Sequence, residues 1–188
     1  MLTLKPYENA EKFKLLGVEF LSHHKYGVKW DKYVLQCIKK AYANMWILKR
    51  LAELGVSTQD IFLTYLSRVR VHLEQNVPLW HFSISKHLRN KLENTQKACL
   101  YIILGPIATP DYYCNLAILN IEPLENRREI LCKKFARKTF KHPVHRQMFT
   151  LRKGNKTRSG CKVVVPEAKT ARYEKSAIAS LAKIINSL

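Results

Sequence analysis

Apolar residues recur at helical spacing along most of this chain, which predicts a series of amphipathic helices. The first helix is predicted from Asp31, a residue type that caps helices, to Leu54. Its apolar face holds Val34, Ile38, Ala41, Met45, Leu48 and Ala52. A second helix is predicted from Ser57, at capping-box spacing from Asp60, to Pro78, which would end it. Its apolar face holds Phe62, Leu66, Val69, Leu73 and Val77.

Two more helices are predicted in the middle of the chain. One begins at Ser83 or Ser85 and ends at Gly105–Pro106. Its apolar face holds Leu88, Leu92, Cys99 and Ile103, with the polar Gln96 among them. The other is short, because Thr109–Pro110 is typical of a cap followed by a first turn and the apolar pattern ends near Leu119.

A fifth helix is predicted from Leu124 to Lys141, stopped before Pro143. Beyond it, residues 153–159 have the composition of a flexible basic linker, and Val163–Val165 can form a short extended piece. Ser176 can cap a last short helix that ends near Asn186.

Before the first helix the pattern changes to that of strands. Lys14–Leu21 predicts a strand with Gly17 inside it, Ser22–Lys25 a polar turn, and Tyr26–Trp30 a short return strand. The sequence therefore predicts a mainly α fold in three parts. They are a small N-terminal β-hairpin over residues 1–30, a helical bundle over 31–143, and a basic, partly flexible tail with a short terminal helix over 144–188.

The charge is concentrated in the last third of the chain. The 188 residues carry a formal net charge of +19, and 47 % of them are apolar, enough to bury a core. Between Arg127 and Lys175 there are sixteen Lys and Arg residues and only three acidic ones. Such a strongly positive electrostatic field favours binding of a polyanion, and nucleic acid is the commonest polyanion partner. A tail that is basic only for solubility is the alternative.

Residues with the spacing of a catalytic or metal site are few. Two-metal phosphoryl transfer needs clustered carboxylates, whereas the aspartates are dispersed and mostly start predicted helices: Asp31, Asp60 and Asp111. Three side chains near one another in sequence could bind zinc: Cys132, His142 and His145. His142 also lies at the predicted helix end, where a cation suits the helix dipole. The five cysteines form no CxxC pair, and no apolar run approaches the ~18 residues of a membrane span. We expect an intracellular protein without cofactor, metal or membrane insertion.

The first helix has a second stripe opposite its apolar face. Lys32, Lys39, Trp46 and Arg50 fall within about 40° of each other, with Tyr42 adjacent. Cations neutralise phosphates, while aromatic groups can meet sugars or base faces. The alternative is a solvated face whose Trp46 packs against the hairpin.

The fifth helix also has two faces. Arg127, Lys134, Lys138 and Lys141 lie within about 60° of each other and are the better nucleic-acid candidates. The other face holds Leu124, Leu131, Cys132 and Phe135, with Arg128 in its middle. Because an unpaired buried guanidinium would be costly, we expect Arg128 to be structural and held by an acid such as Glu74 or Glu93.

Five segments of the chain, in order, resemble LINE-type (non-LTR) retrotransposon reverse transcriptases. Phe13–Phe20, followed by Val28–Trp30 and the long helix, looks like the family's primer-grip hairpin and thumb entry. Arg70–Glu74 with Val77–His81, and Lys91–Lys97 with Ile102–Gly105, resemble its thumb. Leu124–Glu129 resembles its double-arginine helix, and Val165–Pro166 with Arg172–Ser176 resembles its C-terminal tail.

The resemblance implies a thumb and tail that grip a template–primer, with an RNA–DNA duplex favoured over other RNA or DNA. It adds Leu16 and Gly17 of the hairpin and Arg172 of the tail to the expected nucleic-acid contacts. The family's Tyr-Ala-Asp-Asp box, which holds Mg²⁺, is not among these residues, so we expect no polymerase activity from the chain alone. The resemblance also implies that the palm of a related reverse transcriptase is a possible partner, and a location in the nucleus or a cytoplasmic ribonucleoprotein.

Two alternatives remain at this point. The chain could be a helical protein-interaction module derived from the same element, with an apolar face that docks on a palm. It could also belong to an active RNA-directed DNA polymerase whose catalytic region lies outside these residues.

Overall fold

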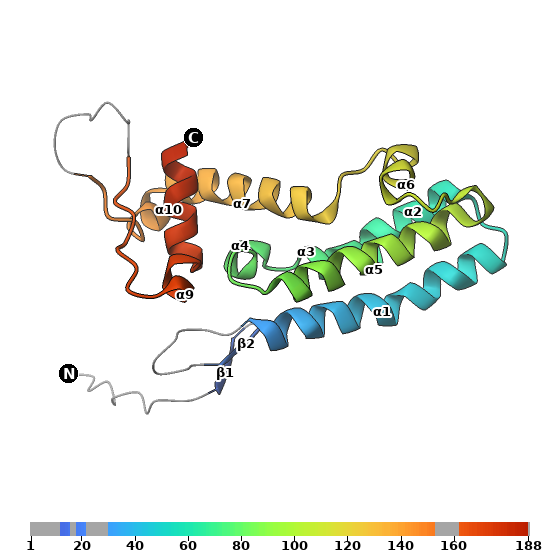
Figure 1. The fold of residues 1–188 in the computed structure, drawn as a ribbon, viewed down its shortest axis with the longest axis horizontal. Helices are drawn as coiled ribbons and strands as arrows, with labels where there is room; N and C mark the ends of the chain where they lie inside the picture. The colour runs from blue at the N-terminus through green and yellow to red at the C-terminus, as the bar shows by residue number, and fades with distance from the viewer. Residues whose placement is uncertain (1–11, 16–17, 22–29, 153–161, 188) are drawn as a thin grey trace.

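The computed structural model describes residues 12–15, 18–21, 30–152 and 162–187, and it confirms the mainly helical fold. Helix α1 (Asp31–Glu53) packs lengthwise against helix α5 (Lys86–Leu104), as Figure 1 shows. Between them in sequence come α2 (Thr58–Thr64), the π-helical segment η1 (Tyr65–Arg70) and α3 (Val71–Glu74), which follow one another without a break and pack beside α1. The result is a helical bundle built around one shared interior.

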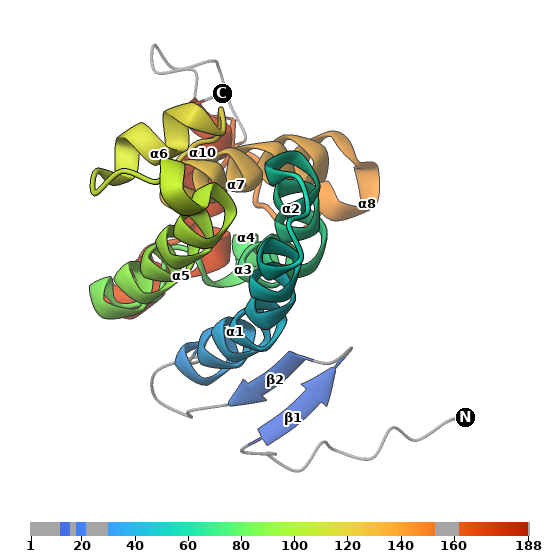
Figure 2. The ribbon, with the colours of Figure 1, turned by 90° about the vertical axis from the view of Figure 1, so that its right-hand side faces the viewer.

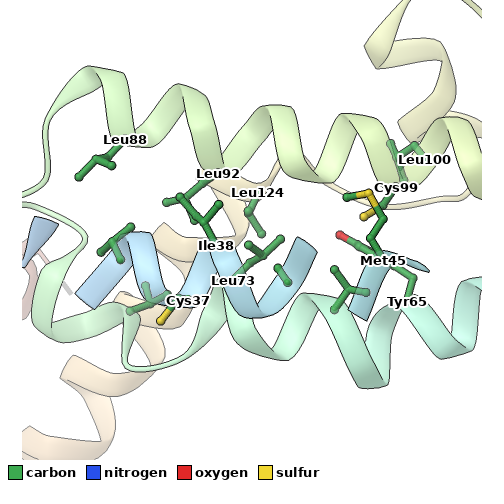
Figure 3. Packing of buried hydrophobic residues seen from close by; sticks show 14 of the residues in the cluster. Cys37, Ile38, Met45, Tyr65, Leu73, Leu88, Leu92, Cys99, Leu100 and Leu124 are labelled. Atoms are coloured by element: carbon green, nitrogen blue, oxygen red, sulfur yellow. The ribbon is translucent and has the colours of Figure 1, made fainter. Parts of the chain in front are cut away.

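The main core lies where these helices face one another. Figure 3 shows Ile38 and Met45 of α1, Tyr65 and Leu73 of the next segment, and Leu92 of α5 pointing into the same interior. All of the predicted apolar positions of α1 up to Leu48 are buried, as are those of α5. Gln96, the polar residue on the α5 face, is fully buried as well and is held by hydrogen bonds.

The second predicted helix differs from the structure in the residues that it buries. Its buried apolar residues are spaced by four: Ile61, Tyr65, Val69 and Leu73. In an α-helix each step of four residues overshoots a full turn by about 40°, so such a stripe would wind away from the core. The wider turn of η1 takes up this excess and keeps the stripe facing α1. Phe62 and Leu66, predicted for the buried face, are only partly buried.

The second predicted helix also ends earlier than expected. It stops at Glu74, because Gln75 is extended and Asn76 adopts a left-handed conformation with φ 55°. Pro78 then lies in the first turn of a new short helix, α4 (Val77–Trp80), where a residue without an N–H is tolerated.

Helix α6 (Tyr112–Ile118) begins later than the predicted cap at Thr109. The side chain of Asp111 accepts a hydrogen bond of 3.1 Å from Tyr113 N and is the true cap. Thr109 instead exchanges backbone hydrogen bonds of 2.8 Å with the side-chain amide of Asn115. The short 3-10 helix η2 (Gly105–Ile107) links α5 to this turn.

Other predicted caps were partly correct. Ser57 and Ser85 accept hydrogen bonds from Asp60 N and Leu88 N, which confirms both helix starts. Asp31 is the first residue of α1 rather than its cap, where its carboxylate still suits the positive end of the helix dipole. The hydroxyl of Ser176 makes no hydrogen bond to a described residue, although Ser180 N donates to its carbonyl.

Helix α7 (Leu124–Lys141) has the predicted bounds and leads to the C-terminal part of the chain. There α8 (Pro143–Arg146), α9 (Ala171–Glu174) and α10 (Ala177–Ser187) follow, and α10 lies across the far end of α7 in Figure 1. A second, smaller core joins them: Ala136, Phe149, Val163, Leu181, Ala182 and Ile185. Val163, predicted to be extended, pairs with Leu151 in an isolated bridge.

At the N-terminus, β1 (Lys12–Leu15) and β2 (Val18–Leu21) pair antiparallel, with Phe13 opposite Phe20 (Figure 2). The run predicted as one strand over Lys14–Leu21 thus contributes to both strands. The predicted return strand over Tyr26–Trp30 falls almost entirely outside the described residues, so the hairpin of the sequence analysis stays a prediction.

Candidate nucleic-acid interface

The stripe predicted on α1 lies on its outer face. Trp46 is 61 % exposed and Tyr42 is 50 % exposed, so neither packs into the bundle core. Lys32, Lys39 and Arg50 are exposed beside them, and Arg50 Nη1 donates 2.7 Å to Glu53 Oε2 on the same helix. The α1 face therefore presents cations and aromatic rings together, opposite seven buried residues.

A hollow of about 440 Å³ adjoins this face. Its lining combines three cations with apolar and aromatic groups: Lys32, Leu35, Gln36, Ile38, Lys39, Tyr42 and Lys91. Lys91 belongs to α5, so the hollow is lined by residues of both α1 and α5. None of its lining residues is acidic. Neither Leu35 nor Lys91 was a predicted contact residue, because their approach depends on how α1 and α5 pack. From here on, the α1 surface means Lys32, Lys39, Tyr42, Trp46, Arg50 and Lys91.

Only part of the stripe predicted on α7 is exposed and able to contact nucleic acid. Lys134, Lys138 and Lys141 are exposed. Arg127 is half-buried, and its Nε lies 3.3 Å from Glu74 Oε1, the atom that Arg70 Nε also reaches at 2.5 Å. Glu74, one of the two acids that we expected to hold Arg128, thus holds Arg127 instead, because Arg127 is the residue turned toward α3.

Arg128 is fully buried, as expected for a structural residue. The predicted ion pair is wrong, however, since none of its three guanidinium nitrogens has a hydrogen-bond partner among the described residues. Burial lowers the pKa of Arg128, and the carboxylates of Glu93 and Glu125 oppose that shift electrostatically. Glu93 Oε1 is itself occupied by Tyr112 Oη at 2.5 Å and Leu124 N at 2.9 Å.

His81 shares this buried environment, and the partly buried Arg89 lies near it. His81 is 4 % exposed, and its Nδ1 has no partner among the described residues. Burial, followed by the positive charges of Arg128 and Arg89, lowers the pKa of His81 from 6.5 to about 4. Arg89 reaches Glu125 at 3.6 Å. His81, Arg89, Glu93 and Arg128 form what we call the buried polar cluster. Only the burial of Arg128 and the nearness of Glu93 were predicted from sequence.

Three predicted contact residues cannot be placed. Leu16 and Gly17 lie outside the described residues. Arg172 belongs to α9, but its side chain is not described.

The aspartates stand at the starts of three different helices: Asp31 in α1, Asp60 in α2 and Asp111 before α6. Within the described ranges, no group of three His, Cys, Asp or Glu side chains could hold a metal ion. The three possible zinc donors are not assembled, because Cys132 is buried while His142 and His145 stack on each other, with ring centres 4.3 Å apart, on the exposed surface. None of the described helices is both long and apolar enough to cross a membrane.

Comparison of the chain with protein-family models, with curated proteins and with solved structures gave no match.

Proposed function

We propose that this chain binds nucleic acid through the phosphate backbone, as a thumb-like module derived from a LINE-type reverse transcriptase, and carries no polymerase chemistry of its own. The observation that supports it best is the α1 surface. Exposed cations and aromatic rings share one helix face, and the adjoining hollow has no acidic lining residue. Cations bind phosphates, and the aromatic groups are suited to sugars or bases.

The dimensions of the α1 surface suit a helical duplex. From Lys32 to Arg50 the helix is roughly 27 Å long at 1.5 Å per residue. A strand of a duplex advances about 3.4 Å per phosphate, so the stripe can follow roughly eight phosphates. The exposed cations of α7, Lys134, Lys138 and Lys141, add positive field on a second helix.

The test is a titration of a fluorescein-labelled RNA–DNA duplex of about 20 base pairs with the full chain, followed by fluorescence anisotropy at several salt concentrations. Lys39→Ala should weaken binding several-fold and lower the slope of log affinity against log salt by about one. Trp46→Ala should weaken binding of a single-stranded probe more than binding of the duplex, because a base can stack on the indole ring only where it is unpaired.

Lys40→Ala is the matched control. Lys40 is exposed, adjacent in sequence and equally charged, but it lies about 100° around α1 from Lys39. Equal effects of the two substitutions would mean that binding follows net charge alone. A chain that binds neither duplex nor single strand at low salt would refute the proposed function.

A further inference from the structure

A second basic hollow lies at the C-terminal end of the molecule, away from the α1 surface. Its volume is about 370 Å³, and five residues line it: Arg137, Phe140, Lys141, Lys162 and Ile185. Three of the five are cationic and none is acidic. We propose that this hollow, the C-terminal hollow, is a binding site for a phosphate group.

The site is assembled from parts of the chain that are distant in sequence. Arg137, Phe140 and Lys141 belong to the last turns of α7, Ile185 belongs to α10, and Lys162 precedes the bridged residue Val163. Of these, only Lys141 was a candidate from sequence. The other cations could not be assigned to one site, because they meet only when α10 packs on α7.

Lys162 is placed in the hollow by its backbone. Asn186 Oδ1 accepts hydrogen bonds of 2.9 Å from both Lys162 N and Val163 N. Asn186 Nδ2 donates 2.9 Å to Val163 O, and the buried side chain of Val163 packs in the second core. The side chain of Lys162 takes no part in these bonds, so it can be replaced without removing them.

The cations of the hollow have no neutralising partner in the described part of the chain. None of the ion pairs found there includes Arg137, Lys141 or Lys162. A fourth cation, Arg146, sits 4.8 Å from the centre of the Phe140 ring. Like charges held close together repel, and a negatively charged phosphate would relieve this repulsion by binding. Arginine offers it a fork of donors, and lysine a point charge.

The apolar part of the lining narrows the ligand class. Phe140 and Ile185 give the hollow an apolar wall beside its cations. A phosphate joined to a sugar or base fits such a wall, whereas a free anion uses only the charges. The phosphate can come from a nucleic-acid backbone or from a small phosphate compound. Only the nucleic-acid source depends on the proposed function of the chain.

The experiment measures two ligands on the same variants of the full chain. Pyrophosphate binding is followed by calorimetry at low salt, and binding of the labelled RNA–DNA duplex by anisotropy. Lys162→Ala and Arg137→Ala should each weaken pyrophosphate binding at least about fivefold. Lys169→Ala is the control, because Lys169 is an exposed lysine of the same C-terminal segment that does not line the hollow.

The two ligands separate the outcomes. If Lys162→Ala weakens both pyrophosphate and duplex binding while Lys169→Ala weakens neither, the hollow holds a nucleic-acid phosphate. If only pyrophosphate binding is weakened, the site stands and its ligand is a small phosphate compound, even where the chain fails to bind duplex at all. The proposal is overturned if pyrophosphate does not bind, or if Lys162→Ala and Lys169→Ala have the same effect. A circular dichroism melt of each variant tests whether the loss of binding comes from a loss of folding.

Discussion

Helices α1 and α7 are both amphipathic and both carry exposed cations, yet their inner faces differ. The seven buried residues of α1 are all apolar or aromatic: Tyr33, Val34, Cys37, Ile38, Ala41, Met45 and Leu48. The buried face of α7 holds Leu124, Arg128, Cys132, Ala136 and Thr139, so a charged residue and a hydroxyl stand among small apolar groups. Phe135, which the pattern assigned to the inner face, is 40 % exposed.

The difference follows from what each helix packs against. Helix α1 meets α5 and the α2–α3 segment along its length, so every inward position needs an apolar side chain. Helix α7 meets α4 and α5, and it meets α10 near its C-terminal end. Its inner face therefore crosses the buried polar cluster and then a small second core. Hydrophobic periodicity locates a buried face reliably only where the surroundings are apolar throughout.

The largest effect is expected from truncating the α1 inner face. Leu48 is fully buried, so Leu48→Ala should lower the free energy of unfolding by about 2–5 kcal/mol through lost burial and the cavity that it leaves. Phe135→Ala should cost less than about 1 kcal/mol although Phe135 is the larger residue, because it is substantially exposed. Denaturant unfolding measures both. A larger loss for Phe135→Ala would show that α7 is buried on a side that the structure leaves open.

The second effect concerns the pH dependence of stability. His81 has a pKa of about 4 in the folded chain against an ordinary value of 6.5, so the unfolded chain takes up a proton first as the pH falls. The His81 contribution to the free energy of unfolding is therefore unchanged above pH 6.5. Between pH 6.5 and 4 it should decline by on the order of 3 kcal/mol.

His81→Gln is the control for this pH dependence, since glutamine does not titrate. Relative to the natural chain, the variant should become more stable with each step of acidification through that window. Parallel stability curves for the two proteins would mean that His81 is not buried beside Arg89 and Arg128.

A smaller effect separates the two neighbouring arginines of α7. Arg128→Ala should lower the melting temperature, with a loss of about 2 kcal/mol, because a cavity replaces a fully buried side chain. Arg127→Ala should cost less than about 1 kcal/mol, because Arg127 is partly exposed and Glu74 keeps its ion pair with Arg70. Equal melting temperatures would refute the structural role of Arg128.

Arg128→Met sharpens this result, because methionine keeps much of the volume and removes the charge. Since no hydrogen bond to a described residue is lost, we expect it to be at least as stable as the natural chain. A large loss of stability for Arg128→Met would show that the charge itself is needed, through the fields of Glu93 and Glu125.

The sequence by itself determined the helical class, the bounds of α7 and the cap at Ser57, and it narrowed the start of α5 to Ser83 or Ser85, because these depend on local periodicity and on hydrogen bonds between residues three apart. It also determined that the α1 stripe faces outward, since that stripe lies opposite an apolar face. Only the tertiary structure decided that Glu74 pairs with Arg127 rather than with Arg128, that η1 widens to keep its stripe inward, and that Lys162 joins Arg137 and Lys141. These features depend on the distance and angle between elements far apart in the chain, which no local pattern encodes.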